Sequence, residues 1–220
     1  QLREPQQAEK FQAAARQYGV AVPSMAMSGF FAQSFLTRDN YQDLLKDCFQ
    51  TMKLFGSKVA FLPLGGSGKD WQQEGCAAYQ QMVSRLRTAG EMAKQEGITI
   101  GIRTGMGAKF DKKLLKKVGS SQIKVYYNFQ DAADHHRDIC KELRKLGAQR
   151  IVQIHVSNTD SVNLQEDPEI NLPKIRKTLD KMKWSGWLVV ERSRDVKRVR
   201  DVKYNFGRNI AYLKQVFQER

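Results

Sequence analysis

Residues 186–193, Gly-Trp-Leu-Val-Val-Glu-Arg-Ser, place an apolar run directly before a carboxylate. Residues 188–190 show no alternation with polar residues, which is typical of a strand covered on both faces. A glutamate at the end of such a strand is costly to bury unless it meets a metal ion, a cation or a substrate. Glu191 is therefore a candidate site residue. The alternative is a carboxylate that reaches solvent or pairs with Arg192 or Arg194.

The run before Glu191 is the last of six similar runs that alternate with helical patterns. The strands are predicted at residues 20–27, 58–64, 98–104, 123–128, 151–156 and 186–191, and the helices at residues 4–18, 39–55, 73–96, 110–118, 131–146, 172–182 and 199–217. Strands that alternate with helices predict parallel pairing through right-handed crossovers. No linker-like segment divides the chain, so we expect one α/β domain over residues 1–220.

Two nucleotide-binding folds are disfavoured by the glycine-rich segment Gly65-Gly66-Ser67-Gly68-Lys69. A P-loop closes with Gly-Lys-Ser/Thr, and a dinucleotide fold needs Gly-x-Gly-x-x-Gly after an early strand. The segment fits neither spacing and is interpreted as a flexible strand-to-helix loop. A TIM-type barrel needs eight strands and typically about 250 residues. Because the chain opens on a helix, we expect that leading strand–helix material is absent.

Bulk composition limits the classes of protein that remain. The chain is 41% hydrophobic, which supports a folded core, and it has no apolar run of membrane-spanning length. The net charge of +14 permits an anionic partner, but most basic runs lie on predicted helices with apolar residues interleaved, as solvated helix faces do. The three cysteines are widely spaced and are read as free thiols. This favours the cytoplasm, although a start at Gln1 leaves an exported or periplasmic protein open.

Polar residues occupy equivalent positions at the ends of the last four predicted strands. They are Arg103, Asn128, His155 and Glu191, one strand–helix unit apart. Each has a structural alternative: an ion-pair partner for the arginine, a helix cap for the asparagine and a hydrogen-bonded core residue for the histidine. The carboxyl ends of barrel strands converge, so together the four favour a functional site.

The four residue types suggest a coherent chemistry. His155 and Glu191 are good ligands for a divalent ion, and the amide oxygen of Asn128 is a weaker third ligand. Such an ion could polarise a sugar carbonyl, and Glu191 could move a proton on or off the adjacent carbon.

Residues 151–158, 170–174 and 184–191 resemble the xylose-isomerase-like TIM-barrel superfamily, and more narrowly its sugar phosphate isomerase/epimerase proteins. The resemblance covers the whole chain. It implies a TIM-type (β/α) barrel in which strands 3–8 are present and the first two strand–helix units are missing. It also implies one divalent metal ion, often manganese, magnesium, cobalt or zinc, held by Glu, Asp, His and Glu, with the two glutamates as acid and base.

The chain keeps two of these four positions. His155 matches the family histidine and Glu191 the last glutamate, whereas Arg103 stands where the first glutamate is expected and Asn128 where the aspartate is expected. The candidate metal ligands are therefore His155, Glu191 and Asn128, and the candidate catalytic residues are Glu191, His155 and Arg103. An arginine cannot ligate a cation, so an Arg103–Glu191 ion pair could replace the metal, or Arg103 could bind an anionic substrate.

Several functions remain open. The leading hypothesis is a sugar or sugar phosphate isomerase/epimerase with metal-assisted proton transfer. The alternatives are a sugar-binding relative without metal or catalysis and a keto-sugar lyase or dehydratase. An apurinic-site endonuclease is disfavoured because its zinc cluster needs several histidines and the chain has three. The expected partner is a small sugar or sugar phosphate rather than a nucleic acid or a membrane, and a homodimer is compatible with the sequence.

Overall fold

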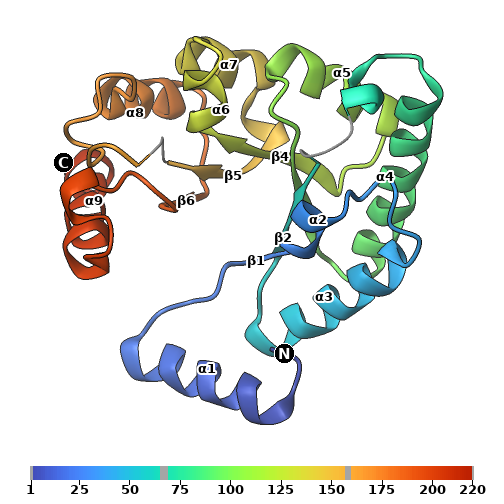
Figure 1. Cartoon of the computed structure of the whole chain (residues 1–220), viewed down its shortest axis with the longest axis horizontal. Helices are drawn as coiled ribbons and strands as arrows, with labels where there is room; N and C mark the ends of the chain where they lie inside the picture. The colour runs from blue at the N-terminus through green and yellow to red at the C-terminus, as the bar shows by residue number, and fades with distance from the viewer. Residues whose placement is uncertain (1, 65–68, 157–159, 220) are drawn as a thin grey trace. The chain divides into compact units, whose positions relative to one another are not determined.

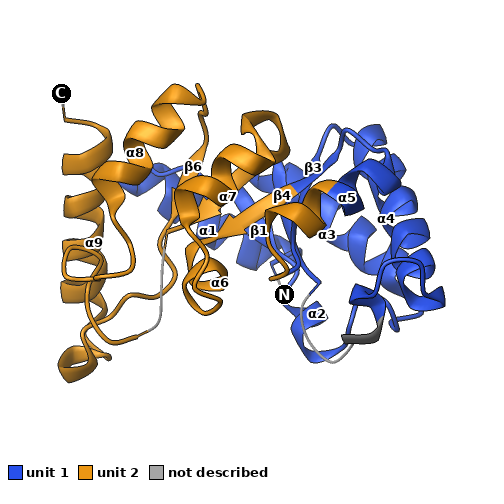
Figure 2. Ribbon diagram, turned by 90° about the horizontal axis from the view of Figure 1, so that it is seen from above, with its two compact units in different colours: residues 1–104, 113–124 blue, residues 105–112, 125–220 orange. Residues whose placement is uncertain are grey.

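A computed structural model describes residues 2–64, 69–156 and 160–219 of the chain (Figure 1). The residues divide into two compact units, coloured separately in Figure 2. Unit 1 contains residues 1–104 and 113–124, and unit 2 contains residues 105–112 and 125–220. The glycines of the segment 65–69 lie outside the described residues. A single-domain organisation remains a prediction.

In unit 1, three strands follow one another in chain order. Strand β1 pairs in parallel with β2 and β2 with β3, with Ser24 beside Val59 and Val59 beside Thr99. The elements of this part of the chain are α1 (Pro5–Tyr18), β1 (Ser24–Ala26), α2 (Gly29–Ala32), α3 (Tyr41–Phe55), β2 (Val59–Pro63), η1 (Lys69–Gln72), α4 (Ala77–Gln95), β3 (Thr99–Arg103) and α5 (Ala108–Val118), the last of which crosses the boundary between the units.

Unit 2 continues the same alternation. Strand β4 pairs in parallel with β5 and β5 with β6, and a register shift follows Val125 in β4. The elements are β4 (Ile123–Asn128), α6 (Phe129–Ala133), α7 (Ile139–Leu146), η2 (Ala148–Arg150), β5 (Ile151–His155), α8 (Leu172–Lys181), β6 (Trp187–Val189), η3 (Val196–Arg198) and α9 (Val202–Phe217). Ile123 and Lys124 of β4 belong to unit 1. Across the described residues, the six strands alternating with helices confirm the predicted α/β class.

The helices form where apolar residues recur at helical spacing. Helix α3 buries Leu45, Phe49 and Met52 along one face. It ends at Gly56, whose φ of 66° is a left-handed conformation that side chains with a Cβ rarely adopt. Within the described part of the chain, none of the helices has the length and apolar character that crossing a membrane requires.

Several boundaries differ from the sequence prediction; the strand predicted at residues 20–27, for example, is only Ser24–Ala26. The helix predicted at residues 131–146 is two helices, α6 and α7, because Asp138 caps a new start by accepting a hydrogen bond from the N–H of Lys141. His136, with a φ of 51°, turns the chain between them. The strand predicted at residues 186–191 is only Trp187–Val189, because its partner strand β5 ends at His155, opposite Val189.

The prediction that this last strand is covered on both faces is also wrong. Trp187 is exposed, and Leu188 and Val189 are only half-buried, whereas Ala60, Phe61 and the other residues of β2 after Val59 are buried. The physical difference is the number of neighbours. Strand β2 lies between β1 and β3, but β6 is paired only with β5 among the described residues.

Cys48 of α3 is expected to react very slowly with alkylating agents. Burial, followed by the nearby charge of Asp47, raises the pKa of the Cys48 thiol to about 12. The thiolate is the reactive form, so in mildly alkaline buffer its alkylation should be about a thousandfold slower than in the unfolded chain. Peptide mass analysis after timed iodoacetamide labelling, with and without denaturant, measures this ratio. Equal rates in the two conditions would contradict the buried placement.

Candidate functional site

Parallel pairing of β4 and β5 places two of the predicted site residues side by side. Asn128 and His155 are register partners at the ends of their strands, and both are buried, with exposed fractions of 3% and 6%. The Tyr126 ring packs against the imidazole, with ring centroids 4.5 Å apart and planes inclined by 57°. The histidine is thus fixed in a polar corner of unit 2 by its strand and by an aromatic neighbour.

Asn128 both caps a helix and faces the histidine. Its Oδ1 accepts a hydrogen bond from the N–H of Gln130 at 2.8 Å, at the start of α6. This bond sets the orientation of the amide, so Nδ2 is the atom that faces Nδ1 of His155, at 3.4 Å. Asn128 is therefore a helix cap, as the structural alternative predicted, and it also lies beside His155. The amide presents an N–H group to the imidazole.

Glu191 reaches the same imidazole from the segment after β6. Its Oε2 lies 3.5 Å from Nδ1 of His155, although Glu191 is two residues beyond the end of the strand. The Glu191 side chain is 52% exposed, whereas that of His155 is 8% exposed. The pair therefore joins an anchored imidazole to a carboxylate that solvent or a ligand can reach.

The arrangement gives Nδ1 of His155 two neighbours of opposite character. When Nδ1 carries no proton, its lone pair can accept from the Asn128 amide. When Nδ1 carries a proton, it can donate to the Glu191 carboxylate. The protonation of Nδ1 thus selects its partner, and His155 and Glu191 form an ion pair when the imidazole is protonated.

Arg103 is placed by different contacts. It ends β3 in unit 1, opposite Pro63, and its carbonyl oxygen accepts a hydrogen bond from the N–H of Leu64 at 2.9 Å. Its side chain is partly buried. Asn128, His155 and Glu191 belong to unit 2. The structure brings these three together, and an ion pair between Arg103 and Glu191 remains a prediction.

The three residues of unit 2 do not fit the divalent ion that the family resemblance implies. The amide of Asn128 turns its N–H group to the imidazole, which leaves His155 Nδ1 and Glu191 Oε2 as the facing ligand atoms. Within the described ranges, no group of three or more His, Cys, Asp or Glu residues could hold a metal ion. One carboxylate and one imidazole supply too few ligands and too little negative charge for a hard divalent cation.

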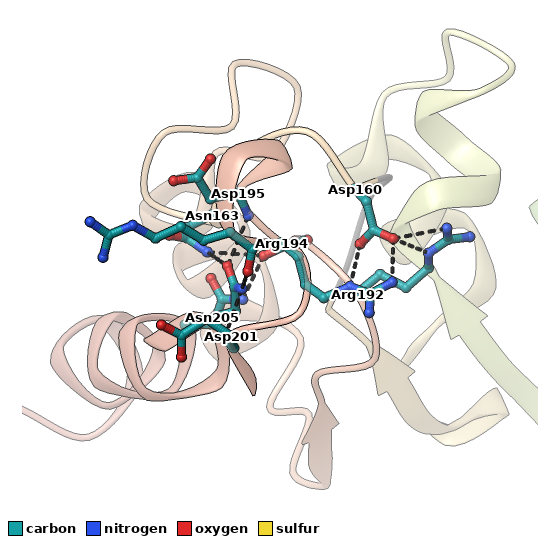
Figure 3. A network of polar contacts seen from close by, with 10 residues as sticks. Asp160, Asn163, Arg192, Arg194, Asp195, Asp201 and Asn205 are labelled. Carbon is teal, nitrogen blue, oxygen red and sulfur yellow. Dashed lines mark hydrogen bonds and ion pairs between the residues drawn. The ribbon is translucent and has the colours of Figure 1, made fainter. Parts of the chain in front are cut away.

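The sequence alternative in which Glu191 pairs with Arg192 or Arg194 is not what the structure shows. Both arginines donate to Asp160, in the loop after β5 (Figure 3). Asp160 is not among the site residues predicted from the sequence. The available signal was the position of this acidic residue shortly after a strand that ends in a candidate histidine. Two arginines stand at a similar position after the next strand.

A cluster of buried amides was missed entirely. Asn163, Asn205 and Asn209 are at most 1% exposed and are linked to the backbone around Ser193. Asn163 lies in the loop after β5, and Asn205 and Asn209 lie in α9, so nothing in the local sequence marked these three as buried.

Comparisons with known proteins agree on the fold. A sugar phosphate isomerase/epimerase from Parabacteroides distasonis has a TM-score of 0.74 at 15% identity, covering 94% of this chain and 75% of that one. D-psicose 3-epimerase from Clostridium cellulolyticum H10 with D-tagatose has a TM-score of 0.76 at 14% identity, covering 96% of this chain and 83% of that one. A xylose isomerase-like TIM barrel protein from Mycobacterium smegmatis in complex with magnesium has a TM-score of 0.73 at 16% identity, covering 97% of this chain and 78% of that one.

At these identities the likeness shows the fold and not the reaction. No curated protein matches the chain. The family model described as "Xylose isomerase-like TIM barrel" matches residues 2–216. This confirms the predicted TIM-type α/β fold, consistent with strands 3–8 of the barrel. The chain belongs to the xylose isomerase-like TIM barrel family.

Proposed function

We propose that the chain is a sugar isomerase or epimerase that moves a proton on a carbon next to a carbonyl group. The observation that carries the proposal is the 3.5 Å approach of the half-exposed Glu191 carboxylate to Nδ1 of the buried His155. A carboxylate that a ligand can reach, beside an imidazole that can exchange a proton with it, is suited to general acid–base catalysis. Sugar epimerases among the solved structures of similar fold add support.

In the proposed reaction, Glu191 takes a proton from the sugar carbon and the electron pair moves into an enediolate. In an isomerisation the proton returns to the neighbouring carbon while the hydroxyl proton moves from one oxygen of the enediolate to the other. In an epimerisation the same carbon takes a proton from water on its opposite face, and Glu191 releases its own proton to solvent. The atoms of the sugar are conserved in both cases. His155 can hold the transferred proton on Nδ1 while Glu191 is free to act again. Arg103 is proposed to bind an oxygen of the substrate, a role suited to its permanent charge.

The proposed reaction is tested by isotope exchange. The purified chain is incubated in deuterated water with a panel of ketoses, and the incorporation of deuterium next to the carbonyl is followed by proton NMR. Exchange at one carbon, with formation of an isomer or epimer, is the expected result. Loss of water from the sugar would instead support a lyase or dehydratase. Failure to exchange with any member of the panel would contradict the proposal.

Metal binding is expected to be weak. The chain should bind manganese or magnesium with low affinity in isothermal titration, because Glu191 supplies the one carboxylate among its three candidate ligands. Asn128→Asp restores one of them and should raise the affinity, whereas Asn40→Asp, at the exposed start of α3, should not. Tight binding by the unaltered chain, or an equal gain in both variants, would contradict the assignment of Asn128 as the residue that weakens the site.

A sugar-binding relative without catalysis is the second candidate. The altered positions Arg103 and Asn128 favour it, because the family's two-glutamate proton transfer is reduced to one glutamate. Saturable binding of a ketose without isotope exchange would select this candidate over the isomerase.

A further inference from the structure

The segment after β6 and the loop after β5 are joined by one carboxylate between two guanidinium groups (Figure 3). Arg192 donates to Oδ2 of Asp160 from Nη2 at 3.0 Å and from Nε at 3.3 Å. Arg194 donates from Nε to Oδ1 at 2.9 Å and from Nη2 to Oδ2. The two arginines therefore converge on one point, although like charges repel.

The charge of this cluster is not balanced. Asp160 neutralises one of the two arginines, which leaves a net charge of +1. Among the described residues, Asp160 is the one acid that forms an ion pair with Arg192 or Arg194. The segment that follows adds four more cations, Lys197, Arg198, Arg200 and Lys203, against Asp195 and Asp201. The side-chain oxygens of these two aspartates already accept backbone N–H groups.

The cluster also has unused donors that a ligand can reach. A guanidinium group carries five N–H donors, and Asp160 faces only the Nε and Nη2 atoms of each arginine. The Arg192 side chain is 45% exposed and that of Arg194 is 31% exposed, whereas Asp160 is 15% exposed. Asp160 is thus the most buried of the three side chains, and the remaining N–H groups of the two arginines can bind a second anion from the solvent side.

The backbone that carries the arginines is fixed before any ligand binds. Ser193 lies between them, is fully buried and has a φ of 68°. Its carbonyl oxygen accepts hydrogen bonds from two buried amides, Asn163 at 3.2 Å and Asn209 at 2.8 Å. A left-handed conformation at a residue other than glycine is held only when its surroundings enforce it. Because the arginines are already ordered, the binding of an anion costs less side-chain entropy.

The carboxylate that orders the arginines stays charged over the working range of a protein. The hydrogen bond from Arg194 is the largest cause that lowers the pKa of Asp160, to about 2; burial opposes it and Arg192 adds to it. The three side chains therefore keep their arrangement at neutral pH.

We propose that Arg192 and Arg194, held by Asp160, form an oxyanion-binding site that takes a phosphate or carboxylate group of the ligand. A guanidinium group binds a carboxylate or a phosphate through two parallel N–H···O bonds. Arg192 directly follows Glu191, so the site lies next along the chain to the proposed proton-transfer residue. The assignment to a sugar ligand rests on the proposed function, and anion binding itself does not.

In the test, the full 220-residue chain is titrated with inorganic phosphate, and phosphate binding is monitored by calorimetry and by NMR of the arginine side chains. The double variant Arg192→Gln/Arg194→Gln is expected to weaken phosphate binding by at least about tenfold, because it removes both charged donors. Arg208→Gln is the matched control, since Arg208 is a similarly exposed arginine that pairs with Glu166. It should leave phosphate binding unchanged. An equal effect in both variants, or no phosphate binding by the unaltered chain, would overturn the proposal.

A gentler variant covers the case in which the double variant does not fold. Arg192→Lys keeps the charge and the ion pair within reach but loses the fork of donors, so it should weaken phosphate binding less than Arg192→Gln. Identical affinities for these two variants and the unaltered chain would also overturn the proposal.

The source of the anion is decided by comparing a free ketohexose, its phosphate monoester and an unphosphorylated sugar acid. Stronger binding of the phosphate ester identifies a phosphate group, and stronger binding of the sugar acid identifies a carboxylate. Either preference must be lost in the double variant. Arginine-dependent binding of a DNA duplex tighter than that of all three would overturn the assignment to a small molecule.

This design separates the two proposals. Isotope exchange without arginine-dependent phosphate binding would contradict the oxyanion site alone. Arginine-dependent phosphate binding without isotope exchange on any sugar or sugar phosphate would contradict the proposed function alone.

Discussion

Glu191→Gln is expected to lower the rate of isotope exchange at the sugar carbon by about 10²–10⁴-fold, the range typical of removing a general base. Glutamine keeps the shape of the side chain and can still hydrogen-bond, but it cannot accept the proton. The side chain is half exposed, so its change should cost little stability. Exchange is measured by NMR in deuterated water, and sugar binding by calorimetry.

A loss of exchange with sugar binding retained would separate catalysis from binding. Glu9→Gln is the matched control, because Glu9 is an exposed carboxylate on α1 that pairs with Arg16. Its exchange rate should equal that of the unaltered chain. If Glu191→Gln exchanges deuterium as fast as Glu9→Gln does, Glu191 is not the base.

Asn205→Ala is expected to lower the free energy of unfolding by about 2–3 kcal/mol, because it leaves buried polar groups without partners. Asn205 is fully buried. Its Oδ1 accepts from the N–H of Asp195 at 2.8 Å and from Nδ2 of Asn163 at 3.0 Å. Its Nδ2 donates to the carbonyl oxygens of Arg198 and Asp201 at 2.7 and 2.9 Å. One side chain thus joins four groups, and Figure 3 labels three of these partners, Asn163, Asp195 and Asp201.

Urea denaturation followed by circular dichroism measures this loss. Asn40→Ala is the control, since Asn40 is exposed and its side chain forms no cap hydrogen bond in α3. That change should alter stability by less than about 0.5 kcal/mol. Similar midpoints for Asn205→Ala and Asn40→Ala would show that water or a shifted backbone replaces the Asn205 bonds.

Local pattern was sufficient for the order of the elements. The apolar face of α3 and the apolar run of β2 were readable because burial in a helix or a central strand depends on residues close in sequence. The ends of elements were less readable. Strand β6 stops at Val189 because β5 offers no further partner. The identities of residues 190–191 do not show where the neighbouring strand ends.

In the candidate site, too, some contacts could be predicted from the sequence and others could not. Asn128 and His155 could be paired from the sequence, because parallel strands of similar length bring equivalent ends together. The contact of Glu191 with His155 depends on an irregular segment instead. Periodicity carries no information about such a segment. Asp160 was not predicted as the partner of Arg192 and Arg194 for the same reason, since it is distant from them in sequence.

The sequence by itself determined the α/β class, the strand order, the family and the residue types at the strand ends, because each is expressed in local hydrophobicity and spacing. The tertiary structure alone decided which groups face one another. It turned the Asn128 amide toward His155 and gave both arginines to Asp160. Hydrogen bonds and ion pairs between distant segments depend on orientation and distance in space, and a linear pattern of residues specifies neither.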